Sequence, residues 1–525
     1  MLPFGDVPGI VGAVAERLAR AHGIGAGDRV ALAGRPSLEH ALVMWATVAL
    51  GAVVVTMNPA WTPPELAHAL TVTRPLVVAA DPAVLPRVRA TVHQSGTDSD
   101  SEAAAGTHAG GMGRAGGRTD GPTSGGAEPG PVLRTFGDVV GPLDPGEPPR
   151  APLPGIAIAE DDPFAVVFTS GTTGRPKGAT LSHRNAVHFS LAAAATTAVH
   201  GLVHGVGGPP ADAPAMIGSA PLFHVSGLLG QLTNAAMWGT TIVFAPPDRW
   251  DATEHLALTE RHRVTSWSVV PTQLWRLVDH PDLDRFDLSS LVMVGGGGAA
   301  FPPELLRRTA ERLPQVSTAL RVGYGMTEVS GTATLLEPPY TDRQRASVGR
   351  PVAGTEVAVR GPDGRELPDG EVGEVWVRAA SVFLGYWDDP DATAACLDVG
   401  RWYATGDVGR IDEGVLVLES RRRDLIIRGG ENVYPIEIEN RLVEHPGIAD
   451  AAVVGVAHAT LGQQVKAVVV RAPGRHGAAL DAAAVRAWAA GALARYKVPQ
   501  LVAFRDELPR NAAGKVLKDE LAERL

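Results

Sequence analysis

Short apolar runs rich in β-branched residues alternate with helical segments near the start of the chain. Such runs occupy residues 30–32, 53–56 and 76–78. The apolar stretch 41–55 is interrupted by Thr47 and Gly51 and is shorter than the roughly 20 residues that span a membrane. This stretch therefore predicts a buried helix followed by a strand, and the alternation as a whole predicts an α/β layer architecture.

The pattern resumes near residue 162 and changes character toward the C-terminus. Further strands are predicted at 240–244, 291–294 and 374–377. After the basic cluster 421–423, the pattern predicts helices at 436–444 and 480–493 and strands at 451–456 and 465–470. We therefore expect a large N-terminal α/β domain of several subdomains at 1–420 and a small C-terminal α+β domain at 421–525.

Residues 94–131 interrupt this pattern. They are mostly Gly, Ala, Ser, Thr and Asp and include almost no large apolar side chain. Such a segment cannot offset the entropy of its own ordering by burying apolar surface. We expect a disordered surface excursion there.

Bulk composition limits the class of protein. A chain of 525 residues exceeds the size at which one core stops growing, about 250 to 300 residues, so several domains are expected. Its 45% hydrophobic and 20% charged residues are typical of a globular protein, and its net charge of −10 argues against a nucleic-acid partner. The single cysteine, Cys396, excludes an intrachain disulfide, and the first six residues lack the features of a signal peptide. These observations predict a cytoplasmic protein without a transmembrane segment.

The stretch FTSGTTGRPKG at 168–178 gathers small residues, hydroxyls and one cation after an apolar run. Its turn glycines let backbone N–H groups point at an anion, its hydroxyls add donors, and Lys177 adds a mobile positive charge. It differs from a P-loop, because Pro176 precedes the lysine and Gly178 follows it. The sequence therefore predicts a polyphosphate-binding loop, and the alternative is a solvated polar turn.

Four further segments strengthen this hypothesis: VGYGMTE at 322–328, YATGD at 403–407, RRRDLIIRGGENVYP at 421–435 and PRNAAGK at 509–515. The first offers an aromatic face for a base, a hydroxyl for a phosphate and a carboxylate for Mg²⁺. In the second, Asp407 follows a glycine turn and could accept hydrogen bonds from ribose hydroxyls. Taken singly, Tyr324 could be a core residue, Asp407 a turn residue and Lys515 a surface lysine.

These five segments, in this order, resemble the core motifs of the adenylate-forming superfamily, which includes acyl-CoA synthetases, firefly luciferase and peptide-synthetase adenylation domains. The resemblance extends from about residue 27 to residue 525, apart from 94–131. It implies a large multi-subdomain N-terminal α/β domain and a small, mobile C-terminal α+β domain. It also implies a ligase that uses ATP and Mg²⁺ to join a carboxylic acid to AMP and then passes the acyl group to CoA.

The resemblance assigns roles to individual positions. The phosphates of ATP would be held by Thr169, Ser170, Gly171, Thr172, Thr173, Gly174 and Lys177. Adenine and ribose would be held by Gly297, Gly298, Ala299, Tyr324, Gly325, Asp407 and Arg421. The implied catalytic residues are Thr327 at the α-phosphate, Glu328 at the Mg²⁺, His224 and Lys515. Lys515 would bridge the substrate carboxylate and the α-phosphate, where cations are needed as negative charge develops.

The resemblance further implies that the small domain swings between two half-reactions about residues 421–424, with Arg423 at the pivot. After the swing, Lys515 would leave the site, and Gly429 and Gly430 would form a slot for the pantetheine arm of CoA. Between Lys515 and Leu525 there is no room for a carrier domain. We therefore expect CoA as the acceptor, with a separate carrier protein as the alternative. An alternative of another class is a non-catalytic nucleotide-binding protein.

The segment PLFHVSG at 221–227 bears on the substrate. Amino-acid-activating members of the superfamily carry an aspartate where this chain has His224, and a buried α-ammonium without a carboxylate partner is costly. His224 is therefore expected to line the carboxylate end of an acyl pocket. Glycines at 295–298, 323 and 325 predict room for a large tail. The sequence favours a medium- or long-chain fatty acid, with a bulky ring acid as the alternative.

Overall fold

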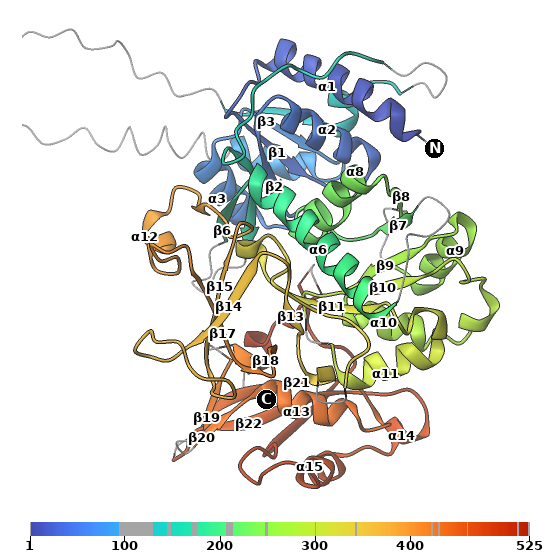
Figure 1. Ribbon diagram of the computed structural model, residues 1–525, viewed down its shortest axis with the longest axis vertical. Helices are drawn as coiled ribbons and strands as arrows, with labels where there is room; N and C mark the ends of the chain where they lie inside the picture. The colour runs from blue at the N-terminus through green and yellow to red at the C-terminus, as the bar shows by residue number, and fades with distance from the viewer. Residues whose placement is uncertain are drawn as a thin grey trace, which may run out of the picture. The chain divides into compact units, whose positions relative to one another are not determined.

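The computed structural model describes residues 2–93, 130–143, 149–169, 176–205, 214–246, 250–299, 301–341, 344–421, 424–428, 431–458, 460–511 and 514–522. They belong to two compact units, Met1–His183 with Tyr386–Asp388 and Arg184–Gly385 with Asp389–Leu525 (Figure 1). The predicted boundary between residues 420 and 421 falls inside the second unit and stays a prediction. Nearly all of the predicted excursion, residues 94–129, lies outside the described residues.

A mostly parallel sheet with strand order β16-β6-β5-β2-β1-β3-β4 forms the centre of the first unit, where β16 is the two-residue strand Gly385–Tyr386. The pairs among β1 to β5 are parallel, and β6 is antiparallel to β5. The elements of this unit are η1 (Phe4–Asp6), α1 (Val7–His22), β1 (Arg29–Ala33), α2 (Leu38–Ala49), β2 (Val53–Met57), α3 (Pro63–Thr73), β3 (Val77–Ala80), β4 (Val132–Thr135), α5 (Phe136–Val140), β5 (Pro163–Thr169) and β6 (Lys177–Ser182).

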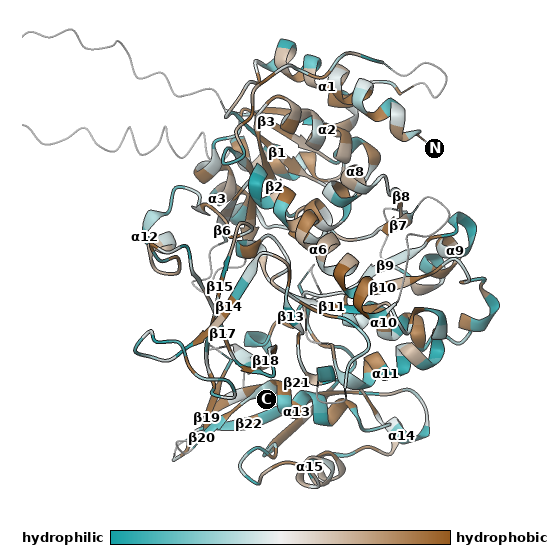
Figure 2. Cartoon of the chain, viewed as in Figure 1, coloured by the Kyte–Doolittle hydropathy of each residue, from teal (hydrophilic) through white to brown (hydrophobic). Residues whose placement is uncertain are grey.

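Burial explains why the first unit is built in layers. Every residue of β2 and β3 is buried, as expected of a parallel sheet that is covered on both faces, and these strands are strongly hydrophobic (Figure 2). Helix α2 begins where the Ser37 side chain accepts a hydrogen bond from the His40 N–H, and it ends before Gly51. The strands predicted at 30–32, 53–56 and 76–78 and the helix-then-strand prediction for 41–55 are confirmed.

The second unit contains three sheets, with strand orders β13-β12-β11-β10-β9-β7-β8, β14-β15-β17-β18 and β20-β19-β22-β21, and β23 pairs with β22. Its strands are β7 (Ala215–Gly218), β8 (Thr241–Phe244), β9 (Ser266–Val269), β10 (Met293–Gly296), β11 (Leu320–Tyr324), β12 (Thr334–Leu336), β13 (Arg350–Pro351), β14 (Thr355–Arg360), β15 (Gly373–Ala379), β16 (Gly385–Tyr386, which reaches the first unit), β17 (Tyr403–Asp412), β18 (Val415–Arg421), β19 (Ile426–Arg428), β20 (Glu431–Val433), β21 (Ile448–His458), β22 (Gly462–Arg471) and β23 (Leu501–Arg505).

The α-helices of this unit are α6 (His183–His204, which starts at the end of the first unit), α7 (Val225–Gly227), α8 (Asn234–Trp238), α9 (Ala252–His262), α10 (Pro271–Val278), α11 (Pro303–Arg312), α12 (Pro390–Ala394), α13 (Pro435–Val443), α14 (Arg475–Ala478), α15 (Ala482–Ala490) and α16 (Asp519–Ala522). A π-helical segment, η2, covers Leu228–Thr233. Short 3₁₀ segments are η3 (Leu283–Arg285), η4 (Pro314–Val316), η5 (Thr327–Val329) and η6 (Gln344–Ala346).

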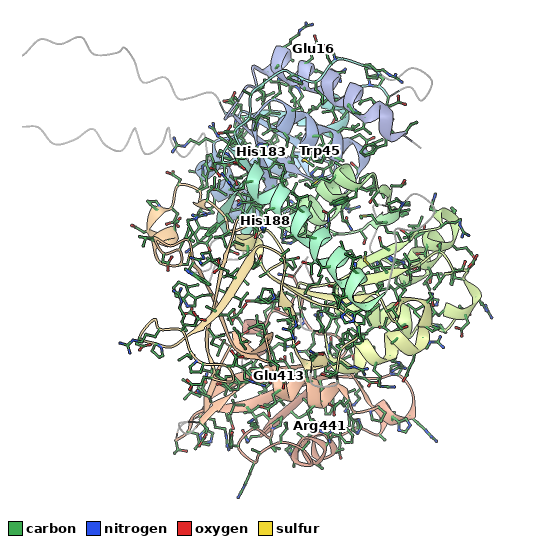
Figure 3. All side chains as sticks on the ribbon, viewed as in Figure 1. Glu16, Trp45, His183, His188, Glu413 and Arg441 are labelled. Atoms are coloured by element: carbon green, nitrogen blue, oxygen red, sulfur yellow. The ribbon has the colours of Figure 1, made fainter. Side chains whose placement is uncertain are left out.

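The predicted C-terminal α+β pattern is confirmed. Helices α13 and α15 lie where helices were predicted, and β21 and β22 contain the two predicted strands. Their facing side chains form one buried apolar cluster with β19. Arg441, which projects from α13 (Figure 3), donates hydrogen bonds to the backbone oxygen of Trp488 and lies over its ring, so α13 and α15 are fixed to each other.

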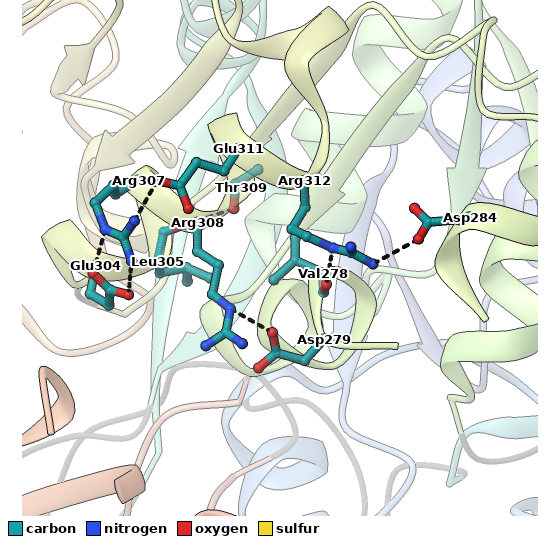
Figure 4. Close-up of polar contacts among 10 residues, drawn as sticks. All are labelled: Val278, Asp279, Asp284, Glu304, Leu305, Arg307, Arg308, Thr309, Glu311 and Arg312. Atoms are coloured by element: carbon teal, nitrogen blue, oxygen red, sulfur yellow. Dashed lines mark hydrogen bonds and ion pairs between the residues drawn. The ribbon is translucent and has the colours of Figure 1, made fainter. Parts of the chain in front are cut away.

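Helix α11 illustrates how the scaffold is stabilised away from the sheets. Its inner face buries Leu305 and Leu306. On its outer face Arg307 pairs with acidic residues of the same helix, while Arg308 lies 2.8 Å from the Asp279 carboxylate next to α10 (Figure 4). These pairs are about half exposed, so each contributes little to stability compared with the buried apolar face.

Among the described residues, α6 is the one helix that is long and apolar enough to cross a membrane. Only 17% of its apolar window is buried, and length with composition is a weak criterion when a single helix meets it. The absence of a transmembrane segment therefore stays a prediction.

Candidate active site

Predicted site segments follow the carboxyl ends of parallel strands in the second unit. Strands β7, β9, β10 and β11 run parallel to one another (Figure 1). His224 comes shortly after β7, Gly297 directly follows β10, and Tyr324 ends β11. In open α/β sheets, ligands bind outside the carboxyl ends of the strands. The fold therefore gathers three of the predicted segments at the edge where a ligand is expected.

Two of the predicted nucleotide-binding residues contact each other. The Tyr324 hydroxyl donates a 2.8 Å hydrogen bond to Asp407 Oδ2, although the two residues are 83 positions apart. Both side chains are buried, with 8% and 5% of their surfaces exposed. Asp407 is also the backbone register partner of Arg421 in the antiparallel pair β17–β18. Three of the seven residues predicted to hold adenine and ribose are thus neighbours, Tyr324 and Asp407 through their side chains and Arg421 through its backbone.

Thr327 and Glu328 lie in the tight turn η5 just after β11. The backbone oxygen of Glu328 accepts a 2.9 Å hydrogen bond from the Phe383 N–H. The Ser330 hydroxyl donates a 2.7 Å bond to the Ser381 backbone oxygen. These two bonds attach the turn to residues 381–383 and fix the backbone of Glu328, a residue with 7% of its surface exposed.

Two residues that no sequence motif identified hold the segment around residues 381–383, which supports the Glu328 turn, in position. The Asn185 amide, at the start of α6, donates to the backbone oxygens of Ala380 and Val382 at 2.7 and 3.1 Å. The Arg401 guanidinium donates to the oxygens of Val382 and Phe383. No motif marks either residue, because their role depends on segments that approach only in the folded chain.

Glycines are required where the backbones at this edge approach each other. A Cβ at Gly297 would lie 2.7 Å from the Gly323 oxygen, and a Cβ at Gly325 would lie 2.2 Å from the Gly331 oxygen. Both distances are below the closest approach of real side-chain atoms, so these positions exclude larger residues. Gly298 and Ala299, also predicted to flank the adenine, directly follow Gly297. Gly298 is exposed and Ala299 is half-buried.

His224 precedes the short helix α7 in a tight turn. Its backbone oxygen accepts a 2.9 Å bond from the Leu228 N–H, and a Cβ at Gly227 would lie 2.3 Å from the Pro221 oxygen. Burial lowers the pKa of the His224 imidazole to about 4, so the ring is neutral near pH 7. The neighbouring Val225 lies 3.8 Å from the Cβ position of Gly331, which places this turn beside the segment that carries Thr327.

Lys515 lies in a loop that the structure ties down at several points. Its N–H donates to Asn511 Oδ1, and its backbone oxygen accepts from the Asn511 N–H, both at 2.9 Å. The preceding residue, Gly514, has a left-handed backbone (φ +79°), and a Cβ there would lie 3.1 Å from Val270 Cγ2. Val270 directly follows β9, so the loop of Lys515 lies at the same carboxyl edge as Gly297 and the end of β11.

In the first unit, Thr169 ends β5 and Lys177 opens β6 as its register partner. The Lys177 ammonium lies 5.1 Å from the centre of the Tyr386 ring, and the Trp387 N–H donates to the Gly178 oxygen at 2.7 Å. The lysine therefore leads into a strand, whereas the lysine of a P-loop leads into a helix. Of the other predicted phosphate- and CoA-binding residues, Ser170, Gly171, Thr172, Thr173, Gly174, Gly429 and Gly430 lie outside the described residues, as do Arg423 and the side chain of Arg421.

Comparison with known proteins identifies the family. Residues 4–387 match AMP-binding enzymes, and residues 437–515 match the AMP-binding enzyme C-terminal domain. The chain is 35% identical to the indoleacetate–CoA ligase of Aromatoleum aromaticum over 99% of this chain and 93% of the relative. It is 34% identical to a feruloyl-CoA synthase from an Amycolatopsis species, over 96% of this chain and 90% of the relative.

Solved structures agree with this result. The crystal structure of ATP-bound MatB from Rhodopseudomonas palustris superimposes with a TM-score of 0.80 and 30% identity, covering 99% of this chain and 92% of MatB. The predicted α/β fold with a large N-terminal and a small C-terminal domain is confirmed. The predicted boundary at 420/421 lies between the two matched segments.

Proposed function

The chain belongs to the AMP-binding enzyme family, and from that premise we propose how its residues activate an acid. It is an AMP-forming acyl-CoA synthetase that uses ATP, Mg²⁺ and CoA. A carboxylate oxygen attacks the α-phosphorus of ATP and pyrophosphate leaves; the CoA sulfur then attacks the acyl carbon and AMP leaves. The observation that carries the residue assignment is the gathering of His224, Gly297, Tyr324 and the Lys515 loop at one sheet edge.

Lys515 is the proposed catalytic cation for the first step. A carboxylate that approaches a triphosphate is repelled by like charge, and the transition state adds negative charge to the α-phosphate oxygens. An ammonium held at the carboxyl edge of the sheet would offset both effects. The position of its loop against Val270 supports this role, and the Thr327 hydroxyl is the proposed second donor to the α-phosphate.

Glu328 is the proposed ligand of Mg²⁺. The described residues contain no cluster of three or more side chains able to hold a metal by themselves. One carboxylate nevertheless suits Mg²⁺ in a nucleotide site, because this ion usually binds through one or two carboxylates and the substrate phosphates. When bound, Mg²⁺ would neutralise phosphate charge, while the contacts of Phe383 and Ser330 keep the Glu328 turn in place.

His224 is proposed to shape the end of the acyl pocket next to the reacting carboxylate. Its neutral ring offers no negative charge to an α-ammonium, which supports an acid without an α-amino group. We propose a bulky ring acid as the substrate, by analogy with the indoleacetate- and ferulate-activating relatives. The medium- or long-chain fatty acid favoured by the sequence remains the second candidate. A cytoplasmic location and a domain boundary at 420/421 complete the proposal.

A pyrophosphate-release screen across carboxylic acids of graded length and shape tests this function. Lys515→Ala should abolish acid-dependent pyrophosphate release but still pass a pre-made acyl-AMP to CoA, whereas Gly430→Leu should do the reverse. Lys518→Met is the matched control, because Lys518 is a nearby lysine whose 2.7 Å partner is Glu439.

Three results would contradict parts of the proposal. Equal loss of both half-reactions in both variants would contradict separate roles for Lys515 and Gly430. Thioester formation only on a phosphopantetheinylated carrier, and never on free CoA, would identify a carrier-loading ligase. Failure of the purified wild type to consume ATP with any acid would identify a non-catalytic nucleotide-binding protein.

A further inference from the structure

The central strands of the seven-stranded sheet in the second unit have one packed face and one open face. Trp267, Val294 and Val322 point into a buried apolar core on one side. The alternate positions of β9, β10 and β11 face the other way and are not fully buried: Ser266, Ser268, Met293, Gly295, Arg321 and Gly323. Strand register places Ser268, Gly295 and Arg321 side by side across the three strands. We name these six residues the open face.

The open face has unfilled space at its centre. Ser268 is exposed although β9 has paired strands on both sides. A Cβ added to Gly295 would meet nothing closer than 3.6 Å, and one added to Gly323 nothing closer than 3.7 Å. Parallel sheets are normally covered with apolar side chains on both faces. A central strand without that cover leaves room for a bound molecule.

Arg321 is the large polar group on this face. Its Nε lies 2.9 Å from Glu337 Oε1, and its Nη1 donates to the Met293 sulfur at 3.0 Å. A thioether is a weak acceptor, so this N–H is poorly satisfied. Glu337 Oε2 lies 3.8 Å from His200 Nδ1, and His200 Nε2 is buried with no hydrogen-bond partner among the described residues. The Arg321 guanidinium, whose side chain is 19% exposed, thus has one N–H on a weak acceptor and lies in a cluster with a buried His200 nitrogen that lacks a partner.

The position of Arg321 along β11 sets how long a bound acid can be. It precedes Tyr324 by three residues, which is about 10 Å of strand at roughly 3.3 Å per residue. Tyr324 is the residue that contacts the proposed ribose ligand Asp407. An acid that reacts at the carboxyl edge and lies along the open face would therefore end beside Arg321 if its body were compact.

From these contacts we infer that the substrate carries a neutral oxygen acceptor, such as a ketone, hydroxyl or ether, at the end remote from the reacting carboxylate, and that Arg321 binds this oxygen. This inference deepens the proposed function and rests on it. An oxygen in place of the thioether would give Arg321 a charge-assisted hydrogen bond. A purely apolar tail would leave the donors unsatisfied, and a second carboxylate would be repelled by Glu337.

Three matched acids test the inference: 3-cyclohexylpropanoate, 3-(4-oxocyclohexyl)propanoate and the analogue that carries a second carboxylate at the ring 4-position. The readout is kcat/KM for pyrophosphate release. Wild type should prefer the ketone over the unsubstituted ring by about ten- to a hundredfold, the range for a hydrogen bond to a charged group. In Arg321→Met this preference should fall to about one.

Arg308→Met is the control, because Arg308 is another ion-paired arginine of the same unit and lies on the outer face of α11. It should keep the wild-type ratio. If Arg321→Met is unstable because Glu337 loses its partner, the double variant Arg321→Met with Glu337→Leu removes the pair together. The ratio of kcat/KM for the ketone to that for the unsubstituted ring in wild type tests the inference even if neither variant folds.

Equal rates for the three acids, a preference for the unsubstituted ring or the dicarboxylate, or an unchanged ratio in Arg321→Met would overturn the inference. So would turnover, in the wider screen, only of acids without an oxygen at that end. Absence of turnover with every acid would instead contradict the proposed function.

Discussion

Replacing Arg510 should show whether the position of Lys515, the proposed catalytic lysine, affects adenylation independently of the stability of the small domain. The Arg510 guanidinium donates to the Gly514 backbone oxygen and to Asp450 Oδ2, both at 2.6 Å. Gly514 immediately precedes Lys515, and Asp450 belongs to strand β21. Arg510 thus ties the loop that carries Lys515 to the sheet of the C-terminal domain.

The expected loss in the free energy of unfolding follows from these two hydrogen bonds. A hydrogen bond that involves a charged group contributes about 1.5–3 kcal/mol, and partial exposure of Arg510 (21%) and Asp450 (29%) reduces that value. Burial already raises the pKa of Asp450, with Arg510 opposing the shift, so removing the guanidinium leaves a costly carboxylate. We expect Arg510→Ala to lower the free energy of unfolding by about 1–3 kcal/mol.

The rate of adenylation should be affected more strongly than the free energy of unfolding. A displacement of about 1 Å at a catalytic group can reduce the rate about a hundredfold. We therefore expect Arg510→Ala to lower kcat for pyrophosphate release about a hundredfold, with little change in KM for ATP. Transfer of a pre-made acyl-AMP to CoA, a step in which Lys515 is not proposed to act, should change by less than about threefold.

Arg510→Lys distinguishes positioning from a purely structural role. A lysine can keep the charge next to Asp450 but cannot donate in a fixed fork to two acceptors. It should restore the unfolding midpoint in urea without restoring adenylation. Lys518→Met, which removes the separate ion pair to Glu439, should leave adenylation within about twofold of wild type. Equal loss of both half-reactions in Arg510→Ala, or full rescue of adenylation by lysine, would refute the reasoning.

Two further predictions concern buried polar groups. Tyr324→Phe removes the 2.8 Å hydrogen bond that the tyrosine hydroxyl donates to Asp407. The free energy of unfolding should therefore fall by about 1–3 kcal/mol, and KM for ATP should rise. An unchanged KM in an ATP titration would show that Tyr324 does not contribute to nucleotide binding. Burial lowers the pKa values of His40, His224 and His255 to about 4, so between pH 6.5 and 4 the unfolded chain binds protons that the folded chain does not. Stability should therefore be complete above pH 6.5, decrease by up to about 1.4 kcal/mol per pH unit for each histidine as the pH falls, and level off below pH 4. The urea midpoint of His40→Phe should change less across this pH range than the midpoint of wild type. An equal change in both proteins would show that His40 does not contribute to the pH dependence of stability.

The sequence was sufficient for elements whose apolar pattern agrees with their burial. Strands β1, β2 and β3 appear where short β-branched runs were found, because both faces of that sheet are packed. Prediction was less accurate at β10, which was expected at 291–294 and occupies Met293–Gly296. Glycine is depleted in strands, so the pattern ended too early. Gly296 is nevertheless a strand residue, since it pairs with Val269 and Val322, and glycine is required there because a Cβ would lie 1.9 Å from the Val269 oxygen.

Site residues were predicted by motif, but the contacts that hold them were not. Tyr324 and Asp407 were named separately, and only the fold brings them within hydrogen-bond distance. Arg510 lies inside a recognised motif, yet its partner Asp450 is 60 positions away and has no local signal. Asn185 supports the Glu328 turn through the backbone of residues 380–382, which no sequence pattern could reveal. Local spacing identifies chemistry, whereas long-range hydrogen bonds determine geometry.

The difference between the two large sheets suggests a sequence signal for the acyl site. In β2 of the first unit every position is apolar or Thr and all are buried. In β9 the sequence Ser-Trp-Ser-Val alternates, and its first serine is half-buried and its second exposed. Alternation is typical of an antiparallel sheet with one solvated face, whereas a central parallel strand should be apolar throughout. When a strand flanked by parallel partners alternates with small polar residues, the missing side chains leave space for the proposed substrate. An arginine in that space, here Arg321, would then contact the polar end of that substrate.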